Sequence, residues 1–133
     1  MKTVLLLFAA LLVSGCATAH LHPVQGPLAT QTPPRTYAVS MDSAAIVAVT
    51  LSKGEVCRGS WSNLAKEDPT ERDLSAEWDL VYGNGAFAAN VLGTLGIARA
   101  ILTCTSGMTM NVEFNSTKGV AKDSNGNVFK LTF

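Results

Sequence analysis

Short segments in which apolar and polar side chains alternate constrain the fold of this chain more than any other feature. In residues 108–114, apolar side chains occupy every second position and polar ones stand between them. Residues 98–104 show a similar pattern, and Ser106-Gly107 separates the two segments. A period of two is typical of a strand with one buried face, and a short turn containing glycine joins neighbouring strands. The two segments therefore predict an antiparallel hairpin.

Comparable segments recur along most of the chain. They lie at 37–42, 45–51, 55–61, 76–82, 120–123 and 128–133. Turn residues separate several of them, namely Ser52-Lys53-Gly54, Gly83-Asn84-Gly85 and Asn125-Gly126. About seven or eight short strands with at most one short helix predict an all-β fold, either a small antiparallel β-sandwich or a small barrel. The small, glycine-spaced residues Ala86 to Gly96 leave helix and strand both open for that segment.

The N-terminus has the three-part layout of a secretory signal. Lys2 supplies one positive charge, an apolar run extends from Val4 to Val13, and small residues precede Cys16. The apolar run is far shorter than the roughly 20 residues that cross a bilayer as a helix. Val13-Ser14-Gly15-Cys16 resembles the lipobox of bacterial lipoproteins, in which the cysteine carries the lipid. An ordinary cleaved signal, with Cys16 as a plain thiol, is the alternative.

The lipoprotein resemblance covers the first sixteen residues and implies a location. It implies cleavage before Cys16, a thioether-linked diacylglycerol on that cysteine and an acylated new N-terminus. Several acyl chains together make membrane attachment effectively permanent. Ala17, with no Asp at that position, resembles the sorting signal for the outer membrane of Gram-negative bacteria. We therefore expect a protein anchored to the outer membrane, with its domain in the periplasm.

A proline-rich stretch follows the lipobox and divides the chain. We expect residues 1–15 to be a cleaved signal, residues 16–35 a lipidated tether and residues 36–133 a single β-domain. The prolines of the expected tether are Pro23, Pro27, Pro33 and Pro34. Proline excludes a regular helix and a central strand and favours extended, solvated backbone.

Two further cysteines remain once Cys16 carries lipid. An exported protein meets an oxidising compartment, so we expect Cys57 and Cys104 to form a disulfide. This bridge would tie the 55–61 strand to the 98–104 strand, and the long loop that it closes predicts a stabilisation of about 4 kcal/mol. Two buried free cysteines are the alternative.

The composition of the expected domain argues against several functions. The chain carries 10 basic and 10 acidic residues, so it has no electrostatic footprint for nucleic acid. Its histidines, His20 and His22, lie in the expected tether, where no further metal ligands stand nearby. No Gly-x-Ser-x-Gly elbow is present. We therefore expect no enzyme activity, no metal site and no cofactor.

Two acidic patterns suggest a functional site, but we prefer a structural explanation for each. Glu77 and Asp79 would share one face of a 76–82 strand, which suggests an acid/base pair, but in-out alternation accounts for them as the solvated face. Asp123, Asn125 and Asn127 alternate like calcium ligands. The glycine of such a loop is displaced, and no late acidic residue follows.

The remaining features predict a non-catalytic envelope lipoprotein that binds a protein or cell-wall partner. A run of mixed charge between two strands is the candidate partner loop, with Lys66, Glu67, Asp68, Glu71, Arg72 and Asp73. An inhibitor or immunity protein against a periplasmic hydrolase, acting through the same loop, is one alternative. The other is a carrier of a small apolar ligand, with an interior lined by Trp78, Tyr82, Met108, Met110 and Phe114.

Overall fold

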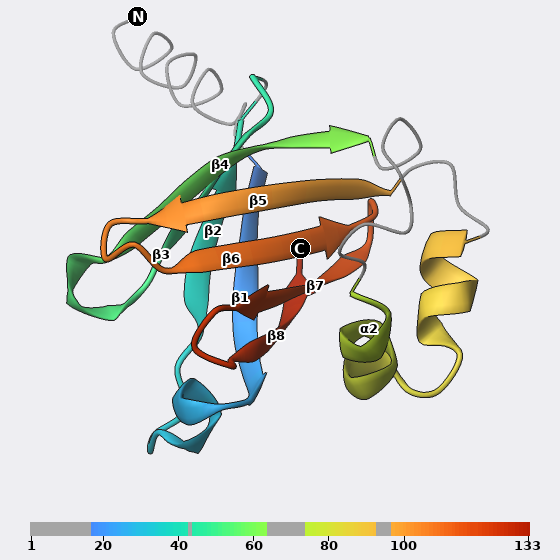
Figure 1. The fold of residues 1–133 in the computed structure, drawn as a ribbon, viewed down its shortest axis with the longest axis horizontal. Coiled ribbons are helices and arrows are strands. Elements are labelled where there is room, and N and C mark those ends of the chain that lie inside the picture. Colours follow the sequence, from blue (N-terminus) through green and yellow to red (C-terminus); the bar gives the residue numbers. More distant parts are fainter. Residues whose placement is uncertain (1–16, 43, 64–73, 93–96) are drawn as a thin grey trace, which may run out of the picture.

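A closed antiparallel barrel forms the body of the protein. The computed structural model describes residues 17–42, 44–63, 74–92 and 97–133. Within these residues each of eight strands pairs with the next in sequence, and β8 closes the sheet by pairing with β1, as Figure 1 shows. The strands are β1 (Ala17–Gln25), β2 (Tyr37–Met41), β3 (Ile46–Thr50), β4 (Val56–Asn63), β5 (Ala98–Cys104), β6 (Thr109–Phe114), β7 (Lys118–Asp123) and β8 (Val128–Thr132). The all-β prediction is confirmed, and the closure makes the fold a barrel.

Every second residue of each strand points into the barrel, where the side chains form one apolar cluster. All eight strands contribute to it, and most of its members are almost fully buried. The largest of the fully buried members are Leu21, Leu102, Met110, Phe129 and Leu131. Side chains fill the interior of a barrel of this size, so the alternation seen in the sequence is the inside-outside pattern of the wall.

The predicted disulfide is confirmed. Cys57 of β4 and Cys104 of β5 lie opposite each other in the register, and their sulfurs are bonded. Both side chains belong to the interior cluster. The bridge therefore joins two neighbouring strands that the chain separates by a long excursion, which includes the helix α2.

The expected tether is wrong for its first half, because Ala17–Gln25 is the strand β1. This strand pairs with β2 on one side and β8 on the other, and Ala19 and Leu21 are fully buried in the interior. Pro23 is accommodated because the register with β8 shifts between Pro23 and Gln25. Such an irregularity is where a sheet tolerates a residue without an N–H donor. Pro27–Thr30 then form the short 3-10 helix η2.

The predicted 76–82 strand is also wrong, because Ser75–Tyr82 is the helix α2. Trp78 and Tyr82 lie four residues apart, and this spacing places two side chains on one face in both a helix and a strand. Leu80 distinguishes the two cases: alternation would bury it, and it is 53% exposed. At the C-terminus of the helix, Gly83 has a positive φ of 102° and donates its N–H to the carbonyl of Asp79.

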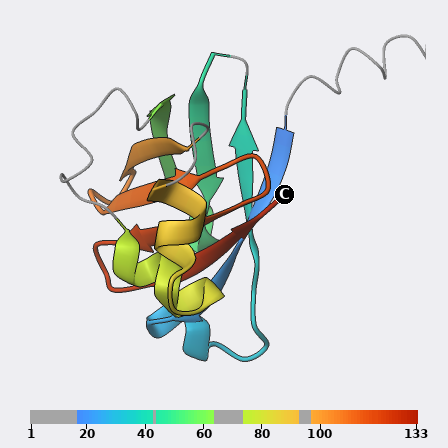
Figure 2. The same cartoon turned by 90° about the vertical axis from the view of Figure 1, so that its right-hand side faces the viewer.

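Figure 2 shows α2 in front of the barrel wall. A second, smaller core lies between this helix and the outer face of the wall. Val120 of β7 points outward from the barrel and is fully buried beneath α2. The other buried members are Leu74, Trp78, Val91 and Ile97. The segment after α2, for which the sequence leaves helix and strand both possible, contains a five-residue π-helix, η5 (Ala88–Leu92). None of the described helices is long and apolar enough to cross a membrane.

Candidate functional site

The barrel has two ends with different surfaces. Because neighbouring strands are antiparallel, the first residues of β1, β3, β5 and β7 and the last residues of β2, β4, β6 and β8 share one end. We call it the Ala17 end, after the residue at which β1 begins. The opposite end holds η2, the β3–β4 turn that contains η3 (Ser52–Gly54), the β5–β6 turn and the β7–β8 turn. Three hollows lie at this opposite end.

A groove runs across this opposite end, which we call the groove end. It consists of three adjoining hollows of about 380, 550 and 410 Å³. Ser52 lines all three hollows, and Gln31 lines the second and third. The other residues of the groove include Pro27, Leu28, Thr32, Pro33, Arg35, Leu51, Gly54, Glu55, Thr105, Ser106, Met108, Asp123, Asn125 and Asn127.

Buried polar contacts hold one wall of the groove in place. The Asn127 side-chain carbonyl accepts the N–H of Leu28 at 2.8 Å, which ties η2 to the β7–β8 turn. Asp123 in turn accepts the backbone N–H and the side-chain amide of Asn127 at 2.9 and 2.8 Å. Gly26 precedes η2 with a φ of 98°, and a Cβ there would lie 2.6 Å from the Gly126 carbonyl oxygen. The Asp123 carboxylate therefore organises the wall through protein N–H groups.

The floor of the groove is apolar and its sides are polar. Leu51 is buried, and Leu28 and Met108 are half-buried and packed against the interior cluster. The Glu55 carboxylate accepts a hydrogen bond from the Ser106 hydroxyl, and Arg35 lies in the third hollow. An apolar floor with a few polar groups at its sides suits an apolar side chain of a partner whose backbone bonds to the rim.

A second polar feature lies beneath α2 and is structural. The fully buried Glu113 of β6 accepts hydrogen bonds from the Trp78 indole at 3.1 Å and from the Arg99 guanidinium at 2.7 Å. The alternation in residues 108–114 predicts that Glu113 lies on the outer face of its strand, and the structure confirms this. The one hint in the sequence that this face is covered is Arg99, a charge within an apolar segment. The network fixes α2 against the barrel wall.

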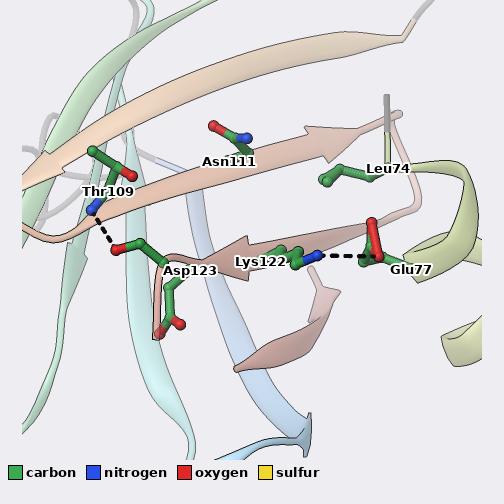
Figure 3. A pocket seen from close by; sticks show the side chains of 7 residues that line it. Leu74, Glu77, Thr109, Asn111, Lys122 and Asp123 are labelled. Carbon is green, nitrogen blue, oxygen red and sulfur yellow. Dashed lines mark hydrogen bonds and ion pairs between the residues drawn. The ribbon is translucent and has the colours of Figure 1, made fainter. Parts of the chain in front are cut away.

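A small hollow of about 240 Å³ opens beside α2 (Figure 3). Lys122 of β7 points toward Glu77, with 3.9 Å between the ammonium nitrogen and the carboxylate oxygen. The Asp79 carboxylate instead accepts the N–H of Phe87 at 3.0 Å. Glu77 and Asp79 are two residues apart on a helix, so they do not share a face. The structure does not bring them together as an acid/base pair.

The histidines lie on the barrel wall, not in a tether. His20 and His22 belong to β1, and the His22 ring lies 2.8 Å from the Thr132 hydroxyl. Partial burial lowers the pKa of His22, and the nearby His20 and Lys130 lower it further. In the described part of the chain, no three residues of the types His, Cys, Asp and Glu are grouped to hold a metal ion.

The five residues proposed to line an apolar interior do not share a chamber. Met110 and Phe114 lie inside the barrel, and Met108 lies at the groove. Trp78 and Tyr82 pack outside the wall, where the Tyr82 hydroxyl donates to the Gly119 carbonyl at 2.9 Å. Burial raises the pKa of this phenol. The carrier hypothesis loses two of its five residues.

Comparison with protein families, with curated proteins and with solved structures finds no match for this chain. The fold and the surfaces described above therefore carry the functional argument. Two predicted features, the lipidated Cys16 and the charged loop Lys66 to Asp73, lie outside the described residues. The groove was not predicted, because residues from four separate segments form it and no local pattern marks it.

Proposed function

We propose that this protein is a non-catalytic lipoprotein of the outer membrane, anchored at Cys16, that binds a protein partner in the groove. The observation that carries the proposal is the position of the groove at the end of the barrel opposite Ala17. A lipid on Cys16, the residue before Ala17, would attach the barrel at its Ala17 end. The groove at the other end would then face the aqueous compartment.

Covalent geometry supports this orientation. Consecutive Cα atoms lie about 3.8 Å apart, so a lipid on Cys16 would be attached one residue before the barrel wall begins. The strand β1 has 9 residues. With a rise of about 3.3 Å per residue and the usual tilt of barrel strands, its far end lies roughly 20 Å from its start along the barrel axis. The groove would stand well clear of the headgroups.

The chemistry of the groove supports a polypeptide partner. Leu28, Leu51 and Met108 offer apolar contact area, and such pockets receive the buried anchor residues that dominate protein interfaces. Glu55 and Arg35 place one negative and one positive charge along the rim. Charges of both signs favour orientation of a mixed-charge protein segment over attraction of a polyanion.

In-cell photocrosslinking tests the proposal. A photoreactive residue replaces Gln31 in the groove, and a matched control replaces Thr103, which is exposed on the outer wall of β5. We expect a discrete adduct from position 31 and none from position 103. Ser52→Arg, which fills the groove at the residue shared by its three hollows, should abolish the adduct, while Thr103→Arg should not.

The same experiment separates the classes of partner. An adduct that protease digestion removes is a protein, and its identity distinguishes a hydrolase held by an inhibitor from a component of envelope assembly. An adduct that disappears only after digestion of the cell-wall glycan would contradict a protein partner. Equal adducts from positions 31 and 103, or an adduct unaffected by Ser52→Arg, would contradict binding in the groove.

A further inference from the structure

Three aromatic side chains close the Ala17 end of the barrel. Trp61 contacts Phe114 with ring centroids 6.1 Å apart, and Phe114 contacts Phe133 at 6.2 Å. Phe114 is buried, but Trp61 is 37% and Phe133 49% exposed. The three rings form a continuous aromatic cluster that is partly open to the surroundings.

Strand pairing places this aromatic cluster at the same end as Ala17. Phe114 is the last residue of β6 and pairs with Ala98, the first residue of β5. Trp61 pairs with Ala100 near the end of β4, and Phe133 directly follows β8. Ala17 itself pairs with Met41, the last residue of β2.

Exposed aromatic rings have a preferred partner in the interface of a lipid bilayer. Trp gathers at the level of the headgroups, where an apolar ring meets a partly hydrated environment, and Phe occurs on the apolar faces of segments that lie in this interface. Lys118, the first residue of β7, adds a cation at this end, and its ammonium group lies 5.3 Å from the centre of the Tyr82 ring. A cation there complements lipid phosphates.

We infer that the aromatic cluster of Trp61, Phe114 and Phe133 is a membrane-contact surface that seats the barrel in the headgroup region. The inference rests on the proposed lipid anchor at Cys16. Because that residue precedes Ala17 directly, the anchor holds this end of the barrel within a few ångströms of the headgroups, about one residue's length. The lipid supplies the attachment, and the rings fix which end of the barrel meets the membrane.

The protein carries its own probe for this contact. Of its 2 tryptophans, Trp61 is partly exposed in the aromatic cluster and Trp78 is fully buried beneath α2. The lipidated protein is reconstituted in vesicles of phosphatidylethanolamine and phosphatidylglycerol whose acyl chains carry bromine, a short-range quencher. We expect quenching of the Trp61 emission in the wild type and almost no quenching in Trp61→Phe, which retains Trp78.

Two controls make the result decisive. Flotation of the vesicles shows whether the protein is anchored, and thermal unfolding shows whether Trp61→Phe keeps the fold. Gln31→Trp in the Trp61→Phe background places the probe at the groove end, where it should remain unquenched.

Each contrary outcome has one meaning. A protein that floats with the vesicles but shows no quenching of Trp61 keeps its anchor and overturns the inference, and crosslinked dimers through this end would assign the aromatic cluster to a second copy of the chain. Quenching at both barrel ends would mean that the barrel lies on its side, which also overturns the inference. A protein that does not float lacks the anchor, so the proposed function and the inference fail together.

Discussion

Single residues decide how α2 is attached. Glu113 of β6 is 0% exposed, and it bonds across the helix–barrel interface to Trp78 of α2 and along the barrel wall to Arg99 of β5. A buried ion pair contributes little net stability compared with well-packed apolar residues, but removal of one partner leaves the other charge poorly compensated. The network therefore specifies where the helix docks more than it adds to the free energy of unfolding.

We predict that Glu113→Leu lowers the free energy of unfolding by about 3 kcal/mol, because the Arg99 guanidinium loses its carboxylate. Urea denaturation measures the change. The double variant Glu113→Leu with Arg99→Met should recover most of the loss. Glu77→Ala is the matched control, since its ion pair with the half-exposed Lys122 should contribute less than about 1 kcal/mol. Equal effects of Glu113→Leu and Glu77→Ala would contradict this account.

His22 predicts a pH dependence at the residue scale. Its pKa is lowered in the folded protein, so the unfolded chain binds the proton more readily. The free energy of unfolding should therefore fall as the pH drops through the ordinary histidine range, from about pH 7 to about pH 5. His22→Gln should show a smaller fall than the wild type in urea denaturation at several pH values. An unchanged pH dependence would contradict the assignment to His22.

Among the elements, β4 and β5 are joined by a disulfide as well as by their antiparallel backbone pairing. We predict that Cys57→Ala with Cys104→Ala lowers the free energy of unfolding by about 4 kcal/mol, because the bridge closes a long loop in the unfolded chain. Guanidinium denaturation measures the loss. Thiol alkylation of the unfolded wild type should label both cysteines only after reduction, and labelling without reduction would contradict the bridge.

The β5–β6 hairpin could be predicted from the sequence, and α2 could not. Within β6, inside and outside positions alternate without exception, so only one periodicity fits. In α2, the four-residue spacing of Trp78 and Tyr82 fits both a strand and a helix, and only the exposure of Leu80 distinguishes the two. The tertiary surface beneath Trp78, including Val120 on β7, favours the helix, and no local sequence pattern reports that surface.

The strand β1 shows a different limit of sequence reasoning. Pro23 and Pro27 predict a tether, because a regular central strand excludes proline. A closed barrel tolerates Pro23 at an irregularity in the pairing, and Pro27 begins η2 directly after the strand. Ala19 and Leu21 alternate with polar residues in the sequence, and both are buried in the barrel.

We predict that β1 is required for the fold. Leu21→Asp places a carboxylate at a fully buried interior position between Tyr37 and Leu131 and should unfold the barrel or lower its stability severely. His20→Asp, the neighbouring outward position, is the control and should leave the melting temperature nearly unchanged. Circular dichroism during heating measures both. A folded Leu21→Asp variant would mean that the chain can form its core without β1.

For the whole molecule, closure and orientation are the properties that the sequence could not supply. The barrel closes because β8 pairs with β1, a contact between the two ends of the described chain. The groove depends on the same long-range arrangement, since η2 meets the β7–β8 turn there. The lipobox resemblance does not depend on the closure of the barrel or on the groove. Together they support the proposal of a barrel that is fixed at one end by a lipid and binds a partner at the other.

Neutron reflectometry of the lipidated protein on a supported bilayer tests this arrangement most directly. Because β1 begins one residue after Cys16, we predict a protein layer in contact with the headgroups, about as thick as the barrel is tall. The Cys16→Ser variant should leave the bilayer bare. A hydrated gap of tens of ångströms between headgroups and protein, as an extended tether of residues 16–35 would give at about 3.1 Å per residue, would contradict the account.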